Sequence, residues 1–181
     1  MSNVMIDIET LSTTPNALIL TIGAIIFNPK DEVIPLKDMN TFYKRVNIDS
    51  CNDLDLDIDK NTLKWWKDQS KEARFEVFEN KDRECIKDIL LALADFIKNC
   101  KYIWSNSPNF DCVIIENVYR KLDIEVPWKF WNLRDARTVY ALANVSLKEF
   151  SGKNVAHNAL EDCYTQIRCL KASFNKLQLN T

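Results

Sequence analysis

The chain has 181 residues, of which 46% are hydrophobic and 28% are charged, so it can bury the core of one globular domain. It contains only two glycines and five prolines and has no linker-like segment, so we expect a single domain over residues 1–181. The formal charge of −2 argues against a protein that holds nucleic acid mainly by neutralising phosphates. It does not exclude a nuclease that holds cations in an acidic site.

The six cysteines are scattered without a Cys-x-x-Cys pair, and the chain has one histidine, so zinc-site spacing is absent. Such cysteines are typical of reduced side chains in an intracellular protein. The N-terminus lacks the basic and apolar segments of a secretion signal, and the longest apolar run, 18–27, is too short to cross a bilayer. We therefore expect a cytoplasmic protein without membrane contact.

Hydrophobic periodicity predicts five strands and six helices. The strands are expected at 4–11, 18–28, 41–47, 102–105 and 131–134. The helices are expected at 61–69, 70–79, 81–100, 109–122, 135–143 and 158–177, with Asn61 and Ser70 as N-caps of the first two. Three consecutive strands, followed by helices that alternate with single strands, indicate an α/β fold: a ribonuclease H-like mixed sheet flanked by helices.

An acidic segment at 51–60 has Asp53, Asp55, Asp57 and Asp59 at alternate positions, as calcium-binding loops do. It lacks the glycine and the terminal glutamate of an EF-hand. We favour a solvated loop that caps the following helix, and a calcium site is the alternative.

The first predicted strand carries two carboxylates. With the two-residue period of a strand, Met5, Asp7 and Glu9 share one face, and the residues between them share the other. A bare carboxylate is costly to bury, so Asp7 and Glu9 require a compensating partner, and a divalent cation such as Mg²⁺ or Mn²⁺ supplies one. In a chain with 26 acidic residues, Asp-x-Glu also arises by chance, so this motif alone is weak evidence.

Two later groups complete a candidate site. Asn106-x-x-x-Phe110-Asp111 follows the fourth predicted strand and begins a helix, and His157-x-x-x-x-Asp162 begins the last helix. Each pattern has a chance frequency on the order of one in ten. Both together, in this order and on these elements, have a chance frequency well below about one in a hundred.

On these motifs the sequence resembles the DEDDh branch of the DnaQ-like exonucleases, which digest nucleic acids from the 3′ end. The resemblance covers nearly the whole chain, with Asp7-Ile8-Glu9-Thr10 as the first family motif, Asn106 to Asp111 as the second and His157 to Asp162 as the third. Within that family the chain is most similar to the phage exodeoxyribonuclease A group and the Rv2179c-like exoribonucleases. The segments that carry this similarity are Thr62 to Ser70, Phe130 to Asn132, Arg134-Asp135 and Arg137-Thr138.

The resemblance implies a metal-dependent 3′–5′ exonuclease that hydrolyses phosphodiester bonds at the 3′ ends of single-stranded DNA or RNA. It implies two divalent cations, Mg²⁺ or Mn²⁺, held by Asp7, Glu9, Asp111 and Asp162, with His157 as the general base. The chemistry agrees, because metals roughly 3.5–4 Å apart stabilise charge on the attacking and leaving oxygens, and a histidine can take the proton of the water. Several relatives are dimers, so a homodimer is one expected assembly, and the host cytoplasm is the expected location if the chain is phage-encoded.

Thr10 and Leu11 follow the metal-binding pair, where the resemblance places contacts to the terminal nucleotide. Leu11 fits a wedge against a base and a packing role about equally well. Asn106 and Phe110 of the second motif are also predicted substrate contacts.

Trp65 and Trp66 are the remaining predicted substrate contacts. Adjacent residues on a helix point about 100° apart, so at least one of the two is expected in the core, and stacking on a base is the alternative role. The cationic side chains nearby and in the later family segments fit either a phosphate-guiding surface or a solvated charged face. They are Lys64, Lys67, Lys71, Arg74, Arg134 and Arg137.

Two alternatives stand beside the exonuclease. A catalytically inactive nucleic-acid-binding module on the same fold could tolerate the loss of a metal ligand, whereas all five predicted catalytic residues are present here. An endonuclease of ribonuclease H type would cut a circular substrate. The choice between DNA and RNA stays open, because this discrimination can rest on one contact to a 2′-hydroxyl.

Overall fold

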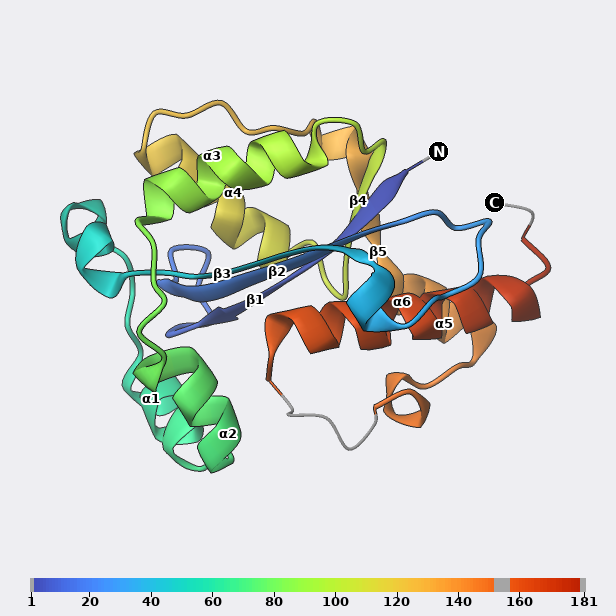
Figure 1. Ribbon diagram of the computed structural model, residues 1–181, viewed down its shortest axis with the longest axis horizontal. Helices are drawn as coiled ribbons and strands as arrows, with labels where there is room; N and C mark the ends of the chain where they lie inside the picture. Colours follow the sequence, from blue (N-terminus) through green and yellow to red (C-terminus); the bar gives the residue numbers. More distant parts are fainter. Residues whose placement is uncertain (1, 152–156, 180–181) are drawn as a thin grey trace.

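A computed structural model describes residues 2–151 and 157–179. Its centre is a mixed five-stranded sheet in the order β3-β2-β1-β4-β5. The strands are β1 (Asn3–Thr10), β2 (Ile19–Phe27), β3 (Asn40–Arg45), β4 (Tyr102–Ser105) and β5 (Leu133–Asp135). The first three form an antiparallel meander, and β4 and β5 run parallel to β1, which therefore lies in the middle of the sheet (Figure 1). This is the mixed sheet that the sequence predicts.

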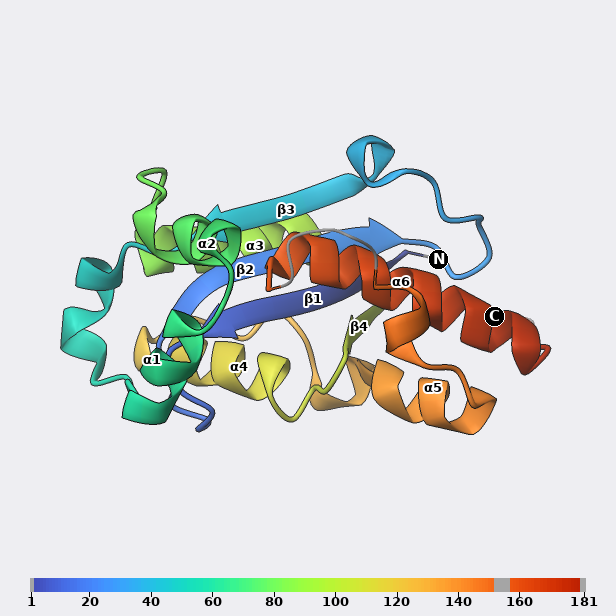
Figure 2. The ribbon, with the colours of Figure 1, turned by 90° about the horizontal axis from the view of Figure 1, so that it is seen from below.

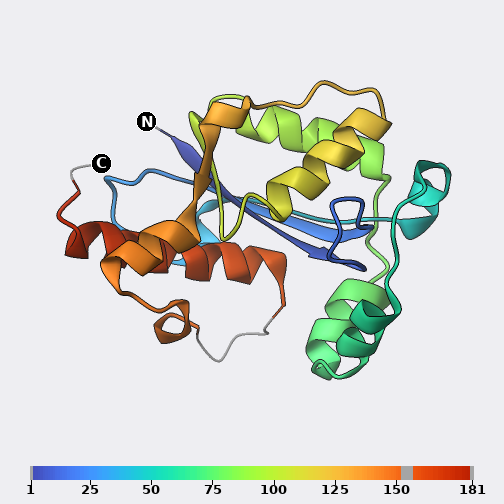
Figure 3. The ribbon, with the colours of Figure 1, turned by 180° about the vertical axis from the view of Figure 1, so that it is seen from behind.

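Helices cover both faces of the sheet. They are α1 (Lys60–Lys67), α2 (Lys71–Arg74), α3 (Ile86–Ile97), α4 (Asp111–Lys121), α5 (Ala136–Ala143) and α6 (Ala159–Lys176). Figure 3 shows α3 and α4 over one face, and α5 and α6 over the other. Within the described residues, no helix is both long enough and apolar enough to cross a membrane.

The alternation along β1 divides the core in two. Val4 and Ile6 point toward the face covered by α3 and α4, and Met5 points toward the face covered by α5 and α6. This is the two-residue period of a strand, and it confirms the predicted assignment of faces. Asp7 and Glu9 continue the face of Met5, which brings them toward α6.

A helical arm, residues 60–79, consists of α1, α2 and the π-helical turn Phe75–Glu79 that continues α2. Figures 1 and 2 show the arm beside the C-terminal end of β1. Trp66 joins the arm to the core, because its ring is buried and its Nε1 donates to the Thr10 carbonyl at 2.9 Å. The C-terminal end of α1 therefore lies beside the last residue of β1.

Most elements lie within a few residues of their predicted bounds, and two of the differences have a clear structural context. The helix expected at 81–100 begins only at Ile86, because Glu84 is held extended beside the sheet: its amide donates to the Arg45 carbonyl at 2.9 Å and its carbonyl accepts from the Asn47 amide at 2.8 Å. This tertiary pairing holds Glu84 outside the helix. The strand expected at 131–134 lies at 133–135, after a 3₁₀ turn at 130–132.

The N-cap of the first helix was also predicted wrongly. Asp59, rather than Asn61, caps α1, and its carboxylate accepts from the Thr62 amide at 2.9 Å. Ser70 caps α2 as expected, accepting from the Ala73 amide at 3.1 Å. Both caps have the side-chain oxygen that helix N-termini require.

Candidate active site

Asp7 and Glu9 occupy the part of β1 that β4 leaves open. The parallel pairing with β4 extends only from Asn3 to Met5, so the chain that leaves β4 passes beside the carboxylates instead of pairing with them. This connection brings Asp111, at the start of α4, to β1, where the Ile8 amide donates to its Oδ1 at 3.3 Å. The end of a parallel strand therefore places three carboxylates together.

Gly23 allows α6 to approach the sheet from the other side. It lies opposite Asp7 in the β1–β2 pair, and a Cβ at this position would lie 2.5 Å from the Ala159 carbonyl carbon. No side chain fits in that space, so glycine is required for the close crossing of α6 over β2. Cys163 packs at the same crossing, with its Sγ 3.4 Å from the Gly23 carbonyl, and Asp162 precedes it.

The four carboxylates and the histidine line one cavity of about 270 Å³. Asp7, Glu9, Asp111, Asp162 and His157 all contribute to its wall. One ligand atom from each of Glu9, His157 and Asp162 lies within 4.8 Å of the others. Within the described residues, this is the group with metal-ligand spacing.

Burial raises the pKa of all four carboxyl groups. The pKa of Glu9 rises to about 8, first because the group is desolvated and then because the charges of Asp162 and Asp111 are near. Desolvation raises the pKa of Asp111 to about 7 and that of Asp162 to about 6. The pKa of Asp7 lies well above its ordinary value, through burial and then the charges of the other three carboxylates. The ionised cluster is therefore short of positive charge.

No ion pair of the described residues supplies that charge. The ion pairs in the described ranges involve none of the four carboxylates. Gln166, one helical turn after Asp162, donates from Nε2 to Asp7 at 2.7 Å, but this amide is neutral. The donor set therefore fits hard divalent cations, which prefer carboxylate oxygens.

His157 stands immediately before Asn158, the N-cap of α6. Its φ of 66° lies in the left-handed region, which histidine enters more readily than most residues. Its half-buried ring packs edge-on against the Trp65 ring, with the centroids 4.6 Å apart. Burial lowers the pKa of His157, so the ring is neutral near pH 7 and able to accept a proton.

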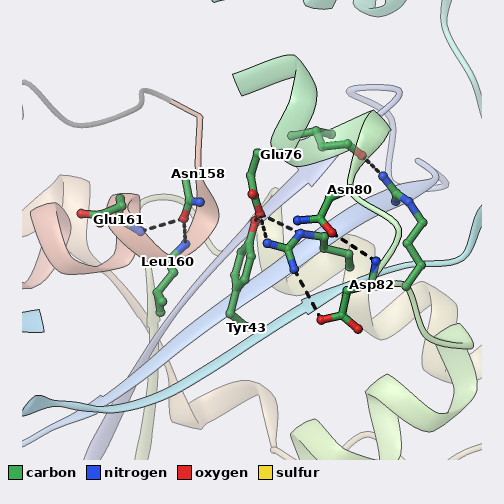
Figure 4. Close-up of polar contacts among 10 residues, drawn as sticks. Tyr43, Glu76, Asn80, Asp82, Asn158, Leu160 and Glu161 are labelled. Atoms are coloured by element: carbon green, nitrogen blue, oxygen red, sulfur yellow. Dashed lines mark hydrogen bonds and ion pairs between the residues drawn. The ribbon is translucent and has the colours of Figure 1, made fainter. Parts of the chain in front are cut away.

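The helical arm that carries Trp65 is anchored to β3 by Glu76. The Glu76 carboxylate accepts from the Tyr43 hydroxyl at 2.7 Å and from Arg45 Nε at 2.8 Å (Figure 4). This charge-assisted contact restrains the arm and, through it, the ring that packs on His157.

The start of α6 is held separately. The Asn158 side chain accepts from the Leu160 and Glu161 amides at 3.1 and 3.2 Å, as Figure 4 shows. An asparagine N-cap satisfies amides that have no partner within the helix. It therefore defines where the helix begins, one turn before Asp162.

A second cavity, of about 630 Å³, adjoins the carboxylate cavity and shares Ile8, Glu9 and Phe110 with it. The rest of its wall comes from the helical arm and from Thr10, Thr13 and Asp59. In this wall Trp65 is 41% exposed and Trp66 only 1% exposed. The expectation that one of these tryptophans joins the core is therefore confirmed for Trp66.

The remaining predicted substrate contacts divide between cavity and core. Asn106 lines the carboxylate cavity, and Phe110 lines both cavities. Leu11 is 4% exposed, packs in the core and lines neither of these two cavities as described. The structure therefore places Leu11 in the packing position that the sequence allowed.

The residues that the sequence prediction missed or left open include Gln166, Gly23 and Arg137. Gln166 could have been found from its i+4 spacing to Asp162, which puts both on one helix face. Gly23 shows the signal of an isolated glycine inside a strand, which marks a close backbone approach. Arg137, whose role the sequence left open, lines the carboxylate cavity from α5 with an exposed side chain.

Asp57, Asp59 and Asp135, which lie outside this cavity, have structural partners. Asp57 accepts from the Thr14 hydroxyl at 2.5 Å and from Asn16 Nδ2 at 2.9 Å, and Asp59 caps α1. Asp135 caps α5 by accepting from the Thr138 amide at 3.2 Å. These contacts favour the capping-loop interpretation of 51–60 over a calcium site.

Known sequences match the chain along nearly its whole length. Residues 2–174 match the sequence model of a family described as the Rv2179c-like 3′-5′ exoribonuclease domain. An exodeoxyribonuclease of Enterobacteria phage T4 is 27% identical over 210 aligned residues, covering 94% of this chain and 88% of the relative.

Solved structures share the fold. Zinc-bound E. coli ExoI in complex with single-stranded DNA superposes with a TM-score of 0.66 at 18% identity, covering 96% of this chain and 40% of that one. The nuclease domain of 3′hExo, a DEDDh family member bound to rAMP, superposes with a TM-score of 0.64 at 12% identity, covering 96% of this chain and 92% of that one. The chain thus spans less than half of ExoI, and the predicted ribonuclease H-like fold is confirmed.

Proposed function

The chain belongs to the family of Rv2179c-like 3′–5′ exoribonuclease domains, and from this premise we propose that the carboxylate cavity is its active site. The family predicted from the three motifs, and with it a 3′–5′ exonuclease, is confirmed. The proposal goes further: the enzyme hydrolyses the last phosphodiester bond at the 3′ end of single-stranded DNA or RNA. The convergence of four uncompensated carboxylates and one neutral histidine on a single cavity carries this proposal.

The residues present fit two divalent cations. Asp7, Glu9, Asp111 and Asp162 offer oxygen ligands of the kind that Mg²⁺ and Mn²⁺ prefer, and their raised pKa values reflect a demand for positive charge. When bound, such cations stabilise charge on the attacking and leaving oxygens. Gln166 orients Asp7 through the hydrogen bond at 2.7 Å, which sets where this carboxylate presents its remaining oxygen.

His157 is the proposed general base. Its neutral ring takes the proton from the attacking water, for which a pKa near or below neutrality is suitable. Trp65 restricts the ring from one side, and the Asn158 cap fixes the backbone that follows. The histidine therefore does not need to be reoriented at each turnover.

The adjoining cavity is the proposed site of the terminal nucleotide. Thr10 and Glu9 link it to the carboxylates, and Trp65 and Phe110 present aromatic surfaces on which a base can stack. ExoI in complex with single-stranded DNA and 3′hExo bound to rAMP support a single-stranded end as the substrate. The proposal includes both sugars, because an exodeoxyribonuclease and an exoribonuclease family both match this chain.

An inactive binding module on the same fold is not favoured, because the family consists of exonucleases and all five catalytic positions are filled. We propose that the exonuclease domain occupies residues 1–181, since the family match extends over 2–174. The T4 relative supports the host cytoplasm as the place of action. A homodimer stays a prediction.

Digestion of matched 5′-labelled single-stranded DNA and RNA tests the proposal. Each oligonucleotide is incubated with Mg²⁺, with Mn²⁺ or with chelator, beside the Asp7→Ala variant. We expect a metal-dependent ladder that shortens from the 3′ end and is absent in the variant. Cleavage in chelator, equal cleavage by the variant, or cutting of a circular strand would contradict the proposal.

A further inference from the structure

A third cavity, of about 380 Å³, lies at the far end of the sheet from the carboxylates. Its walls are Asn3 at the start of β1, Tyr102 and Trp104 on β4, the segment 28–30 after β2, and Phe174 near the end of α6. Figure 3 shows the start of β1 and the C-terminal part of α6 on the same side of the molecule. The volume lies in the range of small-molecule sites, roughly 300–1,000 Å³.

The charged side chains of this cavity are all cations. Lys30, Lys101 and Arg134 line it, and no carboxylate does so within the described residues. The ion pairs found in residues 2–151 and 157–179 include none of these three. Asp135 follows Arg134, but its carboxylate caps α5 instead. In a chain of net charge −2, this is a local excess of positive charge.

Arg134 is fixed in a position that suits anion binding. Its Nη1 donates to the Trp131 and Leu133 carbonyls at 2.8 and 2.7 Å, and its Cζ lies 3.9 Å from the centroid of the Tyr102 ring. Lys101 Nζ lies 4.8 Å from the same centroid. A stacked planar guanidinium keeps further donors for a phosphate, and little entropy is lost when the ligand binds.

The apolar wall of the cavity is equally well held. Trp104 is 8% exposed, donates from Nε1 to Asn3 Oδ1 at 3.0 Å, and packs edge-on against Phe174 with the centroids 5.8 Å apart. Lys171 Nζ donates to the Pro29 carbonyl, which ties the segment after β2 to α6. A cationic rim beside a fixed apolar wall matches a ligand with a phosphate and a planar ring.

We propose that this cavity binds a nucleotide through its phosphate, at a site separate from the carboxylates. The choice of a nucleotide among aromatic anions rests on the proposed exonuclease function, because that reaction brings both a strand and free mononucleotides to the protein. Twelve residues of α6 separate Asp162 from Phe174, which is about 18 Å along the helix. A stacked strand covers this distance with about five nucleotides, so the phosphate belongs either to the strand or to a released mononucleotide.

Binding in chelator tests the proposal independently of catalysis. The full chain in EDTA is titrated with dAMP, AMP and inorganic phosphate by calorimetry, and with 5′-fluorescein-labelled dT3 and dT12 by fluorescence anisotropy at low salt. We expect saturable binding that weakens at least about tenfold in a Lys30→Glu/Lys101→Glu variant. The control with the same change of net charge is Lys87→Glu/Lys98→Glu, at two exposed lysines on α3 and at its C-cap, over the other face of the sheet, and it should bind as the parent does.

The source of the phosphate follows from which ligand loses affinity in the variant. If the Lys30→Glu/Lys101→Glu variant binds dAMP or AMP more weakly than the parent does, the site takes free mononucleotides. If only the binding of dT12 is weakened, the site takes the strand. An Arg134→Ala variant, checked for an unchanged melting transition, should bind the same ligand more weakly. The proposal is overturned if no nucleotide binds in EDTA, if the Lys30→Glu/Lys101→Glu variant binds as the control does, or if Asp7→Asn abolishes the binding. Because binding is measured in EDTA without catalysis, a negative digestion experiment would not change the outcome of this binding experiment.

Discussion

Glu76 and the four carboxylates of the active-site cavity are all largely withdrawn from water, but among these five acids of the described residues only Glu76 forms an ion pair. Its side chain is 17% exposed and bonds to Arg45 and Tyr43, so its charge holds the helical arm on β3. The cavity carboxylates have a neutral amide, backbone amides and each other. The first arrangement stabilises the fold, and the second is costly until a cation binds. The presence or absence of an ion pair therefore distinguishes an acid that stabilises the fold from acids that serve the reaction.

The largest expected effect comes from Asp7→Asn, which removes one charge from the cluster. We expect turnover to fall by about a thousandfold or more, because the loss of metal stabilisation costs several kcal/mol in the transition state. In chelator the same variant should melt at a higher temperature than the parent, since it relieves repulsion among buried acids. Activity assays check the lower turnover, and thermal melts check the higher melting temperature. A lower melting temperature in chelator would show that Asp7, like Glu76, stabilises the fold without a metal.

His157→Gln should lower kcat by about a hundredfold or more while leaving Mn²⁺ binding nearly unchanged. The reason is that glutamine cannot take the proton of the attacking water, whereas the four carboxylates remain. Single-turnover kinetics beside a Mn²⁺ titration of the same preparation separate the two properties. Equal losses in turnover and metal affinity would assign His157 a ligand role instead of a base role.

Glu76→Gln should lower the free energy of unfolding by about 1–3 kcal/mol, because it leaves Arg45 half-buried without its carboxylate. The chain offers a matched control in Asp82, which is 84% exposed and 3.9 Å from Arg45 (Figure 4). Asp82→Asn should change stability by less than about 0.5 kcal/mol. Urea unfolding measures both, and equal effects would show that burial does not distinguish the two acids.

A smaller effect is expected in the pH dependence of the chelated protein. The folded pKa of Glu9 is about 8, above its ordinary value of 4.5, so the folded state holds this proton more tightly than the unfolded state. This contribution to stability is complete below pH 4.5 and is lost as the pH rises to about 8. The melting temperature in EDTA should therefore fall by a few degrees over this window, and added Mg²⁺ should raise it most near pH 8. A flat profile would contradict the raised pKa.

Much of the fold followed from local pattern. The strand 102–105 was predicted with its observed bounds, and the alternation along β1 placed Asp7 and Glu9 on the correct face. The start of α3 was not predictable in the same way, because residues 81–85 have a helical pattern that the pairing of Glu84 with the sheet overrides. The N-cap of α1 was missed because Asp59 and Asn61 are both competent caps.

The candidate site was predictable where residue type and order carry the chemistry. Asp7, Glu9, Asp111, His157 and Asp162 were selected from their motifs, and the structure brings them to one cavity. The third cavity was not predictable, because Lys30, Lys101 and Arg134 come together only through the sheet order and the packing of α6. Side chains that are distant in sequence and lack a motif need the tertiary structure.

A Mn²⁺ titration of the metal-free protein near pH 8, monitored by calorimetry, tests the central claim most directly. If the four carboxylates are held apart from protein cations in order to bind metal, the parent should take up two ions per chain. Asp7→Asn should lose at least one of them, and Glu76→Gln should keep both. Absence of saturable binding in the parent, or undiminished binding in Asp7→Asn, would contradict the assignment of these buried acids as metal ligands.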